Sequence, residues 1–315
     1  MPYNSVMTVS DMGGMVPVEY AREIFNATAE ESAVMKLARR LPDMPTSTRV
    51  MPVQSALAMA YFVTGETGLK QATEINWTGL TLTAEELAVI VPIPEIALAD
   101  AQYPVWDMVY PEVRAAVGKA IDAAILFGTN KPASWPTSIL AGAAAASNTR
   151  QLAGGASADI YDDLLGLSTS VFSLVEADGY AVTGAVADIT MKARLRGLRD
   201  GTSGVPIFMR TVQEKTQYEL DGVPMLFPMN GAMDVTKAHL FAGDWRQLVY
   251  AVRQDLNYKV FTEGVIQDAA GNIIYNLMQQ DLVALRVTFR LGFQIANPVN
   301  RINGTTQYPF ATLIP

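Results

Sequence analysis

The stretch TGETGLKQATEINWTG, residues 64–79, is strongly polar and lies between two apolar patterns that alternate as β-strands do. The patterns are VMPVQSALAMAYFV, residues 50–63, and LTLTAEELAVIVPI, residues 80–93. They predict a hairpin with the polar stretch at its tip. An isolated two-stranded hairpin is marginally stable in water, and this tip has almost nothing with which to pack itself. We therefore expect something outside the hairpin to cover it.

The two patterns also predict which side chains share a face of each strand. The first places alternate apolar residues on one face: Met51, Val53, Leu57, Met59, Tyr61 and Val63. In the second, one phase is set by Leu80 and Leu82, and the other by Leu87, Val89, Val91 and Ile93. The phase changes at Glu85-Glu86, which predicts a β-bulge at these two residues.

Two helices are predicted in the first half of the chain. The first runs through VPVEYAREIFNATAEESAVMKLARR from Pro17, and Pro42 and Pro45 are expected to end it. The second covers residues 104–128, where apolar residues recur at three- and four-residue intervals: Val109, Val113, Ala116, Val117, Ala120, Ile121, Ala124 and Ile125. Gly128 is expected to cap this helix, and Pro111 is expected to kink it or make its first turn irregular.

The remainder of the chain predicts a mixture of helices and short strands. An Ala/Gly-rich connection, residues 140–157, leads to helical patterns at 160–178 and 188–200. Short strands with turn signals then follow in residues 218–229, 239–252 and 281–298. Because the helices and strands do not alternate regularly, the fold class is α+β, and 315 residues provide one or two globular domains.

Composition excludes several classes of function. The formal net charge is -8, and no cluster of Lys and Arg is present to grip phosphates, which argues against a nucleic-acid-binding function and leaves open proximity to DNA without affinity. No apolar run is long enough to cross a bilayer, and no secretory signal precedes the first helix. The chain has no cysteine, which excludes disulfides, thiolate metal sites and a cysteine nucleophile.

Candidate catalytic and metal-binding residues are few. His239 is the single histidine and precedes an apolar strand, which favours a structural role over a catalytic one. A divalent-cation site is one interpretation of Asp159, Asp162 and Asp163, but acidic residues near a helix start more often act as caps and dipole partners. No phosphate-binding loop or nucleophile elbow occurs. We therefore predict no enzymatic activity, no cofactor and no metal.

The predicted hairpin tip carries the residues of most interest for contacts. Glu66 and Lys70 form a candidate charge pair, although such pairs are usually solvated surface. Trp77 is a large apolar residue on an otherwise polar tip. Two interpretations of Trp77 carry equal weight: packing against its own strands, and anchoring into another subunit.

Several motifs, in this order, resemble the major capsid proteins of tailed double-stranded DNA bacteriophages, the phage capsid family with the Hong Kong-type capsid fold. They are DMGGMVPVEYAREIFNATAEESAVMKLA, FVTGETGLKQATEINWTGLTLTAEELAVIVPIPEIALAD, AVGKAIDAAILFGTN, DGTSGVPIF, LDGVPMLFPM, FAGDWRQLVYAV, LVALRVTFRLGFQIANP and PFATL. The resemblance covers nearly the whole chain. It departs from the family at Thr137-Ser138, where a Gly is common, so that turn is expected to differ.

The resemblance implies a division of the chain into four parts. Residues 1–45 would form an N-terminal arm with its helix, and residues 46–94 an extended β-hairpin loop. Residues 95–130 and 249–296 would form a peripheral domain built on a long spine helix, and residues 131–248 and 297–315 an axial domain.

The resemblance also implies a structural protein that self-assembles into hexamers and pentamers of an icosahedral head enclosing double-stranded DNA. Glu66, Lys70 and Trp77 would contact a neighbouring subunit. The other implied partners are a portal protein and a separate scaffolding protein. If Met1 is the encoded start, no long scaffolding segment precedes Gly13, and scaffolding is expected to come from a separate protein or to be dispensable. Assembly would occur in the cytoplasm of the bacterial host, without a membrane.

Some family members link their subunits covalently through a Lys, an acceptor Asn and a catalysing Glu. Lys70 lies near the first position, but the other two fall near Asp281 and Thr288, so no autocatalytic isopeptide bond is expected. The closest rival is an encapsulin-like nanocompartment shell of the same fold, which would hold enzyme cargo instead of DNA. A soluble α+β enzyme is the more distant rival.

Overall fold

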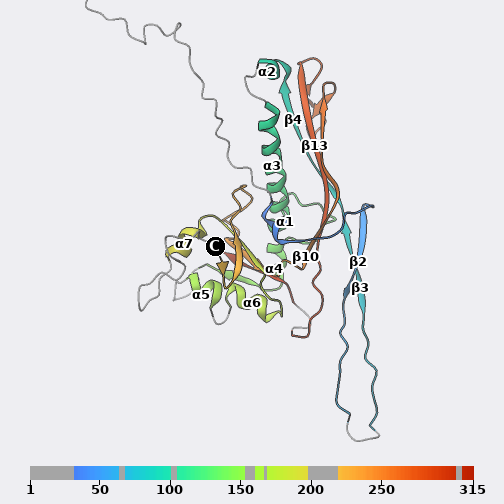
Figure 1. Ribbon diagram of the computed structural model, residues 1–315, viewed down its shortest axis with the longest axis vertical. Helices are drawn as coiled ribbons and strands as arrows, with labels where there is room; N and C mark the ends of the chain where they lie inside the picture. Colours follow the sequence, from blue (N-terminus) through green and yellow to red (C-terminus); the bar gives the residue numbers. More distant parts are fainter. Residues whose placement is uncertain are drawn as a thin grey trace, which may run out of the picture.

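The computed structural model describes residues 32–63, 68–100, 105–152, 160–166, 169–197, 219–302 and 307–315. Within these ranges it contains seven helices, a four-stranded sheet, a six-stranded sheet and two two-stranded sheets. The α+β fold class predicted from the sequence is therefore confirmed. Figure 1 shows an elongated molecule, with a helix and long strands along the main axis and a smaller group of helices and strands to one side.

The long body is the four-stranded sheet together with one helix. Its strand order is β1 (Arg39–Arg40), β10 (Leu248–Phe261), β13 (Leu282–Ile295) and β4 (Glu85–Pro94). Helix α3 (Val105–Phe127) lies along this sheet (Figure 1). Ile121 and Ile125 of α3 share one hydrophobic core with Leu285 and Phe293 of β13. This core is what holds the helix against the sheet.

Helix α3 forms where the apolar spacing predicts it. Gly128 ends the helix with φ +76°, and its N–H donates a hydrogen bond to the carbonyl oxygen of Ala124. One predicted core position is wrong, because Ala116 is exposed and lines a cavity of about 410 Å³ beside the helix. Pro111 lies inside α3 and is exposed. A kink at Pro111 stays a prediction.

The six-stranded sheet has apolar side chains buried on both faces. Its order is β5 (Thr149–Gln151), β14 (Phe310–Ile314), β9 (Leu240–Gly243), β6 (Gly184–Ala187), β8 (Val223–Leu226) and β7 (Glu219–Leu220). Phe241 and Phe310 face the core shared with α3, whereas Leu240 and Leu313 face a second core. Two helices of the second core are α5 (Ile160–Leu165) and α6 (Val171–Ala177), and α7 (Met191–Gly197) also contributes to it. These three helices lie within the helical patterns predicted from the sequence.

Helix α4 (Ile139–Ala145) was not predicted, because its Ala/Gly-rich sequence has little apolar periodicity. The side chain of Ser138 accepts a hydrogen bond from the N–H of Ala141 and caps it. The other elements that were not predicted include α2 (Glu95–Asp100), β5, β6, β11 (Val265–Gln267) and β12 (Ile273–Asn276).

The predicted first helix is shorter at its end than expected. The structure describes α1 (Ala33–Leu37), and the chain is already extended at Ala38 before it pairs as β1 with β10. The expectation that Pro42 and Pro45 end the helix is therefore wrong. Pairing with a strand of the body ends it five residues before the first proline. Residues 17–31 of the predicted helix lie outside the described residues.

The predicted hairpin is present, but its strands differ from the prediction. β2 (Thr48–Gln54) pairs with β3 (Trp77–Thr83), and we call residues 48–83 the ribbon. The first strand was expected to reach residue 63, yet the ladder ends where the N–H groups of Ser55 and Ala56 donate to the carbonyl oxygen of Asn76. In Figure 1 the ribbon projects from the body at the end opposite α2.

The phase change near Glu85-Glu86 is real, but it is not a β-bulge. The chain leaves the ribbon at Thr83 and enters the four-stranded sheet at Glu85, where β4 pairs with β13. A change of sheet at Ala84 therefore re-aims the side chains. Leu87, Val89 and Val91 then pack against the core beneath α3, as the second phase predicted.

Candidate functional site

The ribbon has one face that no described residue covers. Strand register places Val50, Pro52 and Trp77 on this side, with Pro52 directly opposite Gly79. Val50 and Trp77 are each 64% exposed. A Cβ on Gly79 would lie 2.9 Å from a methyl carbon of Val50, so the glycine lets the valine side chain lie across β3. We call Val50, Pro52, Trp77 and Gly79 the outer face.

The opposite face of the ribbon is covered only near the body. Met51, Val53 and Leu80 are half-buried there, and Leu82 is fully buried. Leu82 shares a small core with Met44, Ala84 and Ala251. The root of the ribbon is therefore anchored, while the stable folding of its far part needs contacts from elsewhere.

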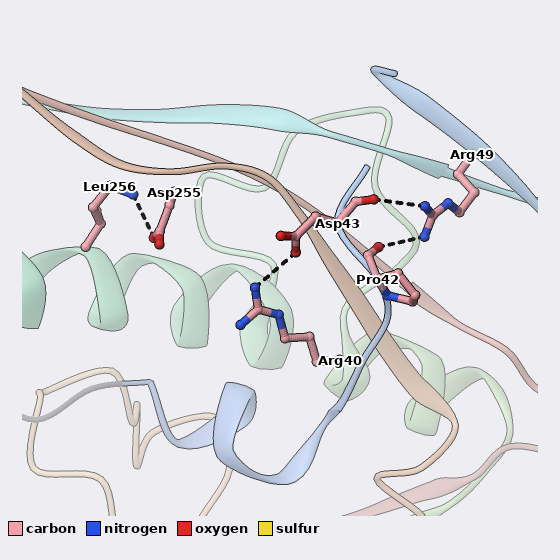
Figure 2. Close-up of polar contacts among 6 residues, drawn as sticks. All are labelled: Arg40, Pro42, Asp43, Arg49, Asp255 and Leu256. Atoms are coloured by element: carbon pink, nitrogen blue, oxygen red, sulfur yellow. Dashed lines mark hydrogen bonds and ion pairs between the residues drawn. The ribbon is translucent and has the colours of Figure 1, made fainter. Parts of the chain in front are cut away.

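Polar contacts also hold the root (Figure 2). The guanidinium of Arg49 donates to the carbonyl oxygens of Pro42 at 2.7 Å and Asp43 at 3.0 Å. The carboxylate of Asp43 pairs with Arg40 at 3.0 Å, and this hydrogen bond raises the pKa of Arg40. The forked donor geometry of arginine lets one side chain tie β2 to the segment that follows β1.

The passage from ribbon to body is tightly packed, and we call Thr83 and Ala84 the joint. The carbonyl oxygen of Thr83 accepts a hydrogen bond from the indole nitrogen of Trp135 at 3.2 Å. The N–H of Ala84 donates to the carbonyl oxygen of Ser47 at 2.8 Å. Gly292 of β13 lies directly against the joint, because a Cβ there would be 2.5 Å from the Thr83 oxygen.

The three residues predicted to contact a neighbouring subunit differ in where they lie. Trp77 begins β3 instead of lying in the tip, and its 64% exposure means that its own strands leave most of the ring uncovered. Lys70 is exposed beyond the end of the ladder. Glu66 lies outside the described residues, so its charge pair with Lys70 stays a prediction.

A buried carboxylate ties the first described helix to α3. Asp122 accepts hydrogen bonds from the Ser32 hydroxyl, from the N–H groups of Ala33 at 3.0 Å and Val34 at 3.2 Å, and from the Asn230 amide at 2.8 Å. Burial raises the pKa of Asp122, and the four donated hydrogen bonds oppose that rise. Sequence reasoning used Asp122 only as part of a motif. The missed signal is a charged residue on the apolar face of a helix.

The residues considered as catalytic or metal-binding candidates make contacts typical of structural residues. His239 is buried, its backbone N–H donates to the carbonyl oxygen of Leu313, and burial lowers the pKa of its imidazole. Asp163 is buried and pairs with Arg150 at 2.8 Å, whereas Asp162 is exposed and Asp159 lies outside the described residues. Among the described residues, no group of three His, Asp or Glu side chains is placed to hold a metal ion. No helix in those ranges has the length and apolar character needed to span a bilayer.

A long helix on a four-stranded sheet, a separate six-stranded sheet and a ribbon with one uncovered face agree with the architecture that the resemblance implied, the Hong Kong-type capsid fold of shell-forming subunits. The sequence profile of the phage capsid family matches residues 12–302, and the chain belongs to this family.

Individual relatives agree with this assignment. The chain is 24% identical over 298 residues to the major capsid protein of Staphylococcus phage 80alpha. The aligned region covers 93% of this chain and 86% of the relative. A solved chain from Microbacterium phage Oxtober96 is 33% identical, with a TM-score of 0.83 and coverage of 99% of this chain and 100% of its own. A chain from Mycobacterium phage Adephagia is 26% identical, with a TM-score of 0.82 and coverage of 99% and 98%.

The function is therefore that of a phage capsid subunit, as the resemblance implied, and the family consists of structural proteins. The nanocompartment alternative is not favoured, since the family profile and the curated relatives are those of phage capsids.

Proposed function

We propose that copies of this chain assemble as hexamers and pentamers into an icosahedral phage head that encloses double-stranded DNA. The observation that carries the proposal is the outer face of the ribbon, where Val50 and Trp77 lie exposed over Gly79 with no described residue above them. Large exposed aromatic and apolar side chains on a projecting element are typical of protein interfaces.

The contact made by the ribbon is heterologous: the ribbon of one copy lies on the body of the next, which in turn extends its own ribbon. Contacts of this kind generate closed rings when the rotation between copies is suitable. Specific interfaces typically bury about 1,200–2,000 Å² in total, and each subunit of a shell makes several of them. Of the two interpretations of Trp77, we accordingly propose the second, in which it anchors into another subunit.

We further propose the division into arm (1–45), extended loop (46–94), peripheral domain (95–130 and 249–296) and axial domain (131–248 and 297–315). In support, α3 shares one core with β10 and β13, and the described six-stranded sheet draws its strands from 149–243 and 310–314. β4 lies in the extended-loop range by sequence but pairs with β13 of the peripheral range.

The proposed partners beyond other copies are a separate scaffolding protein, a portal protein and the packaged DNA. With a formal charge of -8, the subunit would lie beside DNA without strong adhesion and without sequence-specific contacts. Assembly is proposed to take place in the cytoplasm of the bacterial host.

The experiment is assembly of the purified chain, followed by light scattering and electron microscopy, for the wild type, Trp77→Ala and Trp77→Phe. A tryptophan buries about 150–250 Å². Covering the 64% of Trp77 that is exposed would therefore bury about 130 Å², worth about 3 kcal/mol per contact. We expect Trp77→Ala to raise the concentration needed for assembly about 100-fold. Trp77→Phe keeps an aromatic ring and should stay close to the wild type.

Assembly of Trp77→Ala at wild-type concentrations would contradict the interface. A wild-type chain that stays monomeric under all assembly conditions would contradict the shell. Nuclease-protected DNA inside purified particles supports a phage head, whereas bound enzyme cargo supports a compartment.

A further inference from the structure

A cavity of about 410 Å³ lies beside α3. Its walls come from α3, from the start of β4 and from residues 129–135, and they are mostly apolar: Leu87, Ala120, Ala124, Pro132, Trp135 and Leu291. Pockets that hold small molecules typically measure about 300–1,000 Å³ and combine apolar walls with a few polar groups. The size and lining of this cavity therefore suit a small organic molecule.

Short side chains on α3 create the space. Ala116, Ala120 and Ala123 are spaced by four and three residues, so they lie on one face of the helix. Another wall is held in place by Trp135, whose ring meets that of Phe293 edge-on at 4.9 Å and whose indole nitrogen donates to the carbonyl oxygen of Thr83. A wall that is fixed on two sides needs little rearrangement to receive a ligand, and this favours binding.

Two carboxylates border the cavity, and each already has a partner. Glu85 accepts a hydrogen bond from the hydroxyl of Ser134 at 2.5 Å. Side chains alternate between the two faces of a strand, and Leu87 packs beneath α3, so Glu86 lies on the opposite face of β4. There the carboxylate of Glu86 is 3.8 Å from the guanidinium of Arg290. Of the two carboxylates, only Glu85 therefore lies on the helix side of β4.

The ammonium of Lys119 supplies a charge that a ligand can use. Lys119 lines the cavity from α3, is exposed, and forms no ion pair with another described residue. A Cβ on Gly231 would lie 3.5 Å from its nitrogen, so the residue that meets the ammonium there has no side chain to offer it. A negative group on an apolar molecule would complement Lys119, whereas the carboxylate of Glu85 would repel a second negative charge.

We propose that the cavity binds a small organic anion with a compact apolar body. The apolar body packs between the alanines of α3 and Trp135, and its single anionic group pairs with the ammonium of Lys119. This site goes beyond the proposed shell and does not depend on it, because every residue involved belongs to one subunit.

A bound anion would join three parts of the subunit. It would contact α3, β4 and the segment that carries Trp135, and this segment also donates to the joint at Thr83. A ligand that binds the folded chain and not the unfolded one stabilises the fold by mass action. At about 100 times its dissociation constant, the ligand should raise the melting temperature of the subunit by about 3–5 °C.

The test measures binding of 8-anilinonaphthalene-1-sulfonate to the unassembled wild-type subunit by isothermal titration calorimetry. This probe joins an apolar ring system to a single sulfonate. We expect one molecule to bind per subunit and the melting temperature to rise. N-phenyl-1-naphthylamine has the same ring system without the sulfonate, and it should bind about five-fold more weakly.

Substitutions identify the cavity as the site of binding. Ala120→Leu places a larger side chain inside the cavity and should abolish the single site. Ala144→Leu makes the same change at an exposed position of α4 that does not line the cavity, and it should bind the sulfonate as the wild type does. Lys119→Gln should weaken binding of the sulfonate about five-fold and leave binding of the neutral analogue unchanged, whereas Lys119→Arg should keep the wild-type affinity for both.

Ala120→Leu or Lys119→Gln subunits that bind the sulfonate as the wild type does would overturn the proposed site. Wild-type subunits that show no saturable binding, or that bind both probes equally, would overturn it as well. Binding to free subunits that is lost in assembled shells would show that a second copy fills the cavity, which also contradicts a ligand site. None of these results affects the proposed shell, because assembly itself tests the shell.

Discussion

Replacing Gly292 with alanine should loosen the joint between the ribbon and the body. The added Cβ would lie 2.5 Å from the carbonyl oxygen of Thr83 and 3.3 Å from the nitrogen of Ala84. Ordinary contact begins at 3.4 Å, so the oxygen must withdraw by 3.4 − 2.5 = 0.9 Å. Both sides of this contact are backbone, and β13 is held between β10 and β4, so neither side yields easily. Withdrawal also weakens the hydrogen bond from Trp135 to Thr83.

Overpacking of this kind costs about 1–3 kcal/mol. We therefore expect Gly292→Ala to lower the melting temperature of the unassembled subunit by about 2–10 °C, measured by calorimetry or circular dichroism. Gly197→Ala is the matched control, because a Cβ at Gly197 meets nothing within 4 Å. A Gly292→Ala subunit that melts with the wild type would refute the reasoning, since the joint would then have room that the structure does not show.

Three further predictions concern the buried carboxylate, the root and the covalent state. Asp122→Ala leaves four donors without their acceptor, and because a buried donor left unsatisfied costs about 1–3 kcal/mol, denaturant unfolding should show a loss of about 3 kcal/mol; a loss below about 1 kcal/mol would contradict the assigned hydrogen bonds. Arg49→Lys removes the forked contact to Pro42 and Asp43, so amide hydrogen exchange in β2 and β3 should accelerate while exchange in α3 stays unchanged. Exchange rates in β2 and β3 equal to those of the wild type would count against the role of the forked contact. Shells dissolved in denaturant should give only monomers by mass spectrometry, because Asp281 and Thr288 stand near the positions of the acceptor Asn and the catalysing Glu, and a dimer-sized species would show a covalent link.

Helix α3, which has a strong local sequence signal, was predicted well. Helix α3 follows from apolar spacing and a terminal glycine, and both signals act within a few residues of one another. The place where the hairpin pattern changes phase was also predicted to within two residues. Its cause was not, because the pairing of β4 with β13 joins residues about two hundred positions apart. Periodicity within one segment contains no information on its distant partner.

Some features of the candidate site were also predictable from local sequence, and others depended on how the strands pair. That the ribbon lacks its own core follows from composition, and Trp77 follows from its contrast with polar neighbours. The outer face needed the register, because only the pairing of Pro52 with Gly79 places Val50 and Trp77 on one side. The early end of β2 has a similar reason: the apolar alternation continues to residue 63, but the described residues opposite offer no continuing ladder.

The continuity of β3 with β4 determines how the subunit bears mechanical load. The two strands follow one another along the long axis of the molecule, interrupted only at Ala84 (Figure 1). A neighbour that pulls on the ribbon along its length therefore pulls β4 parallel to β13. The ten residue pairs between these strands then resist together in shear, and do not open one at a time as they would if peeled from an end.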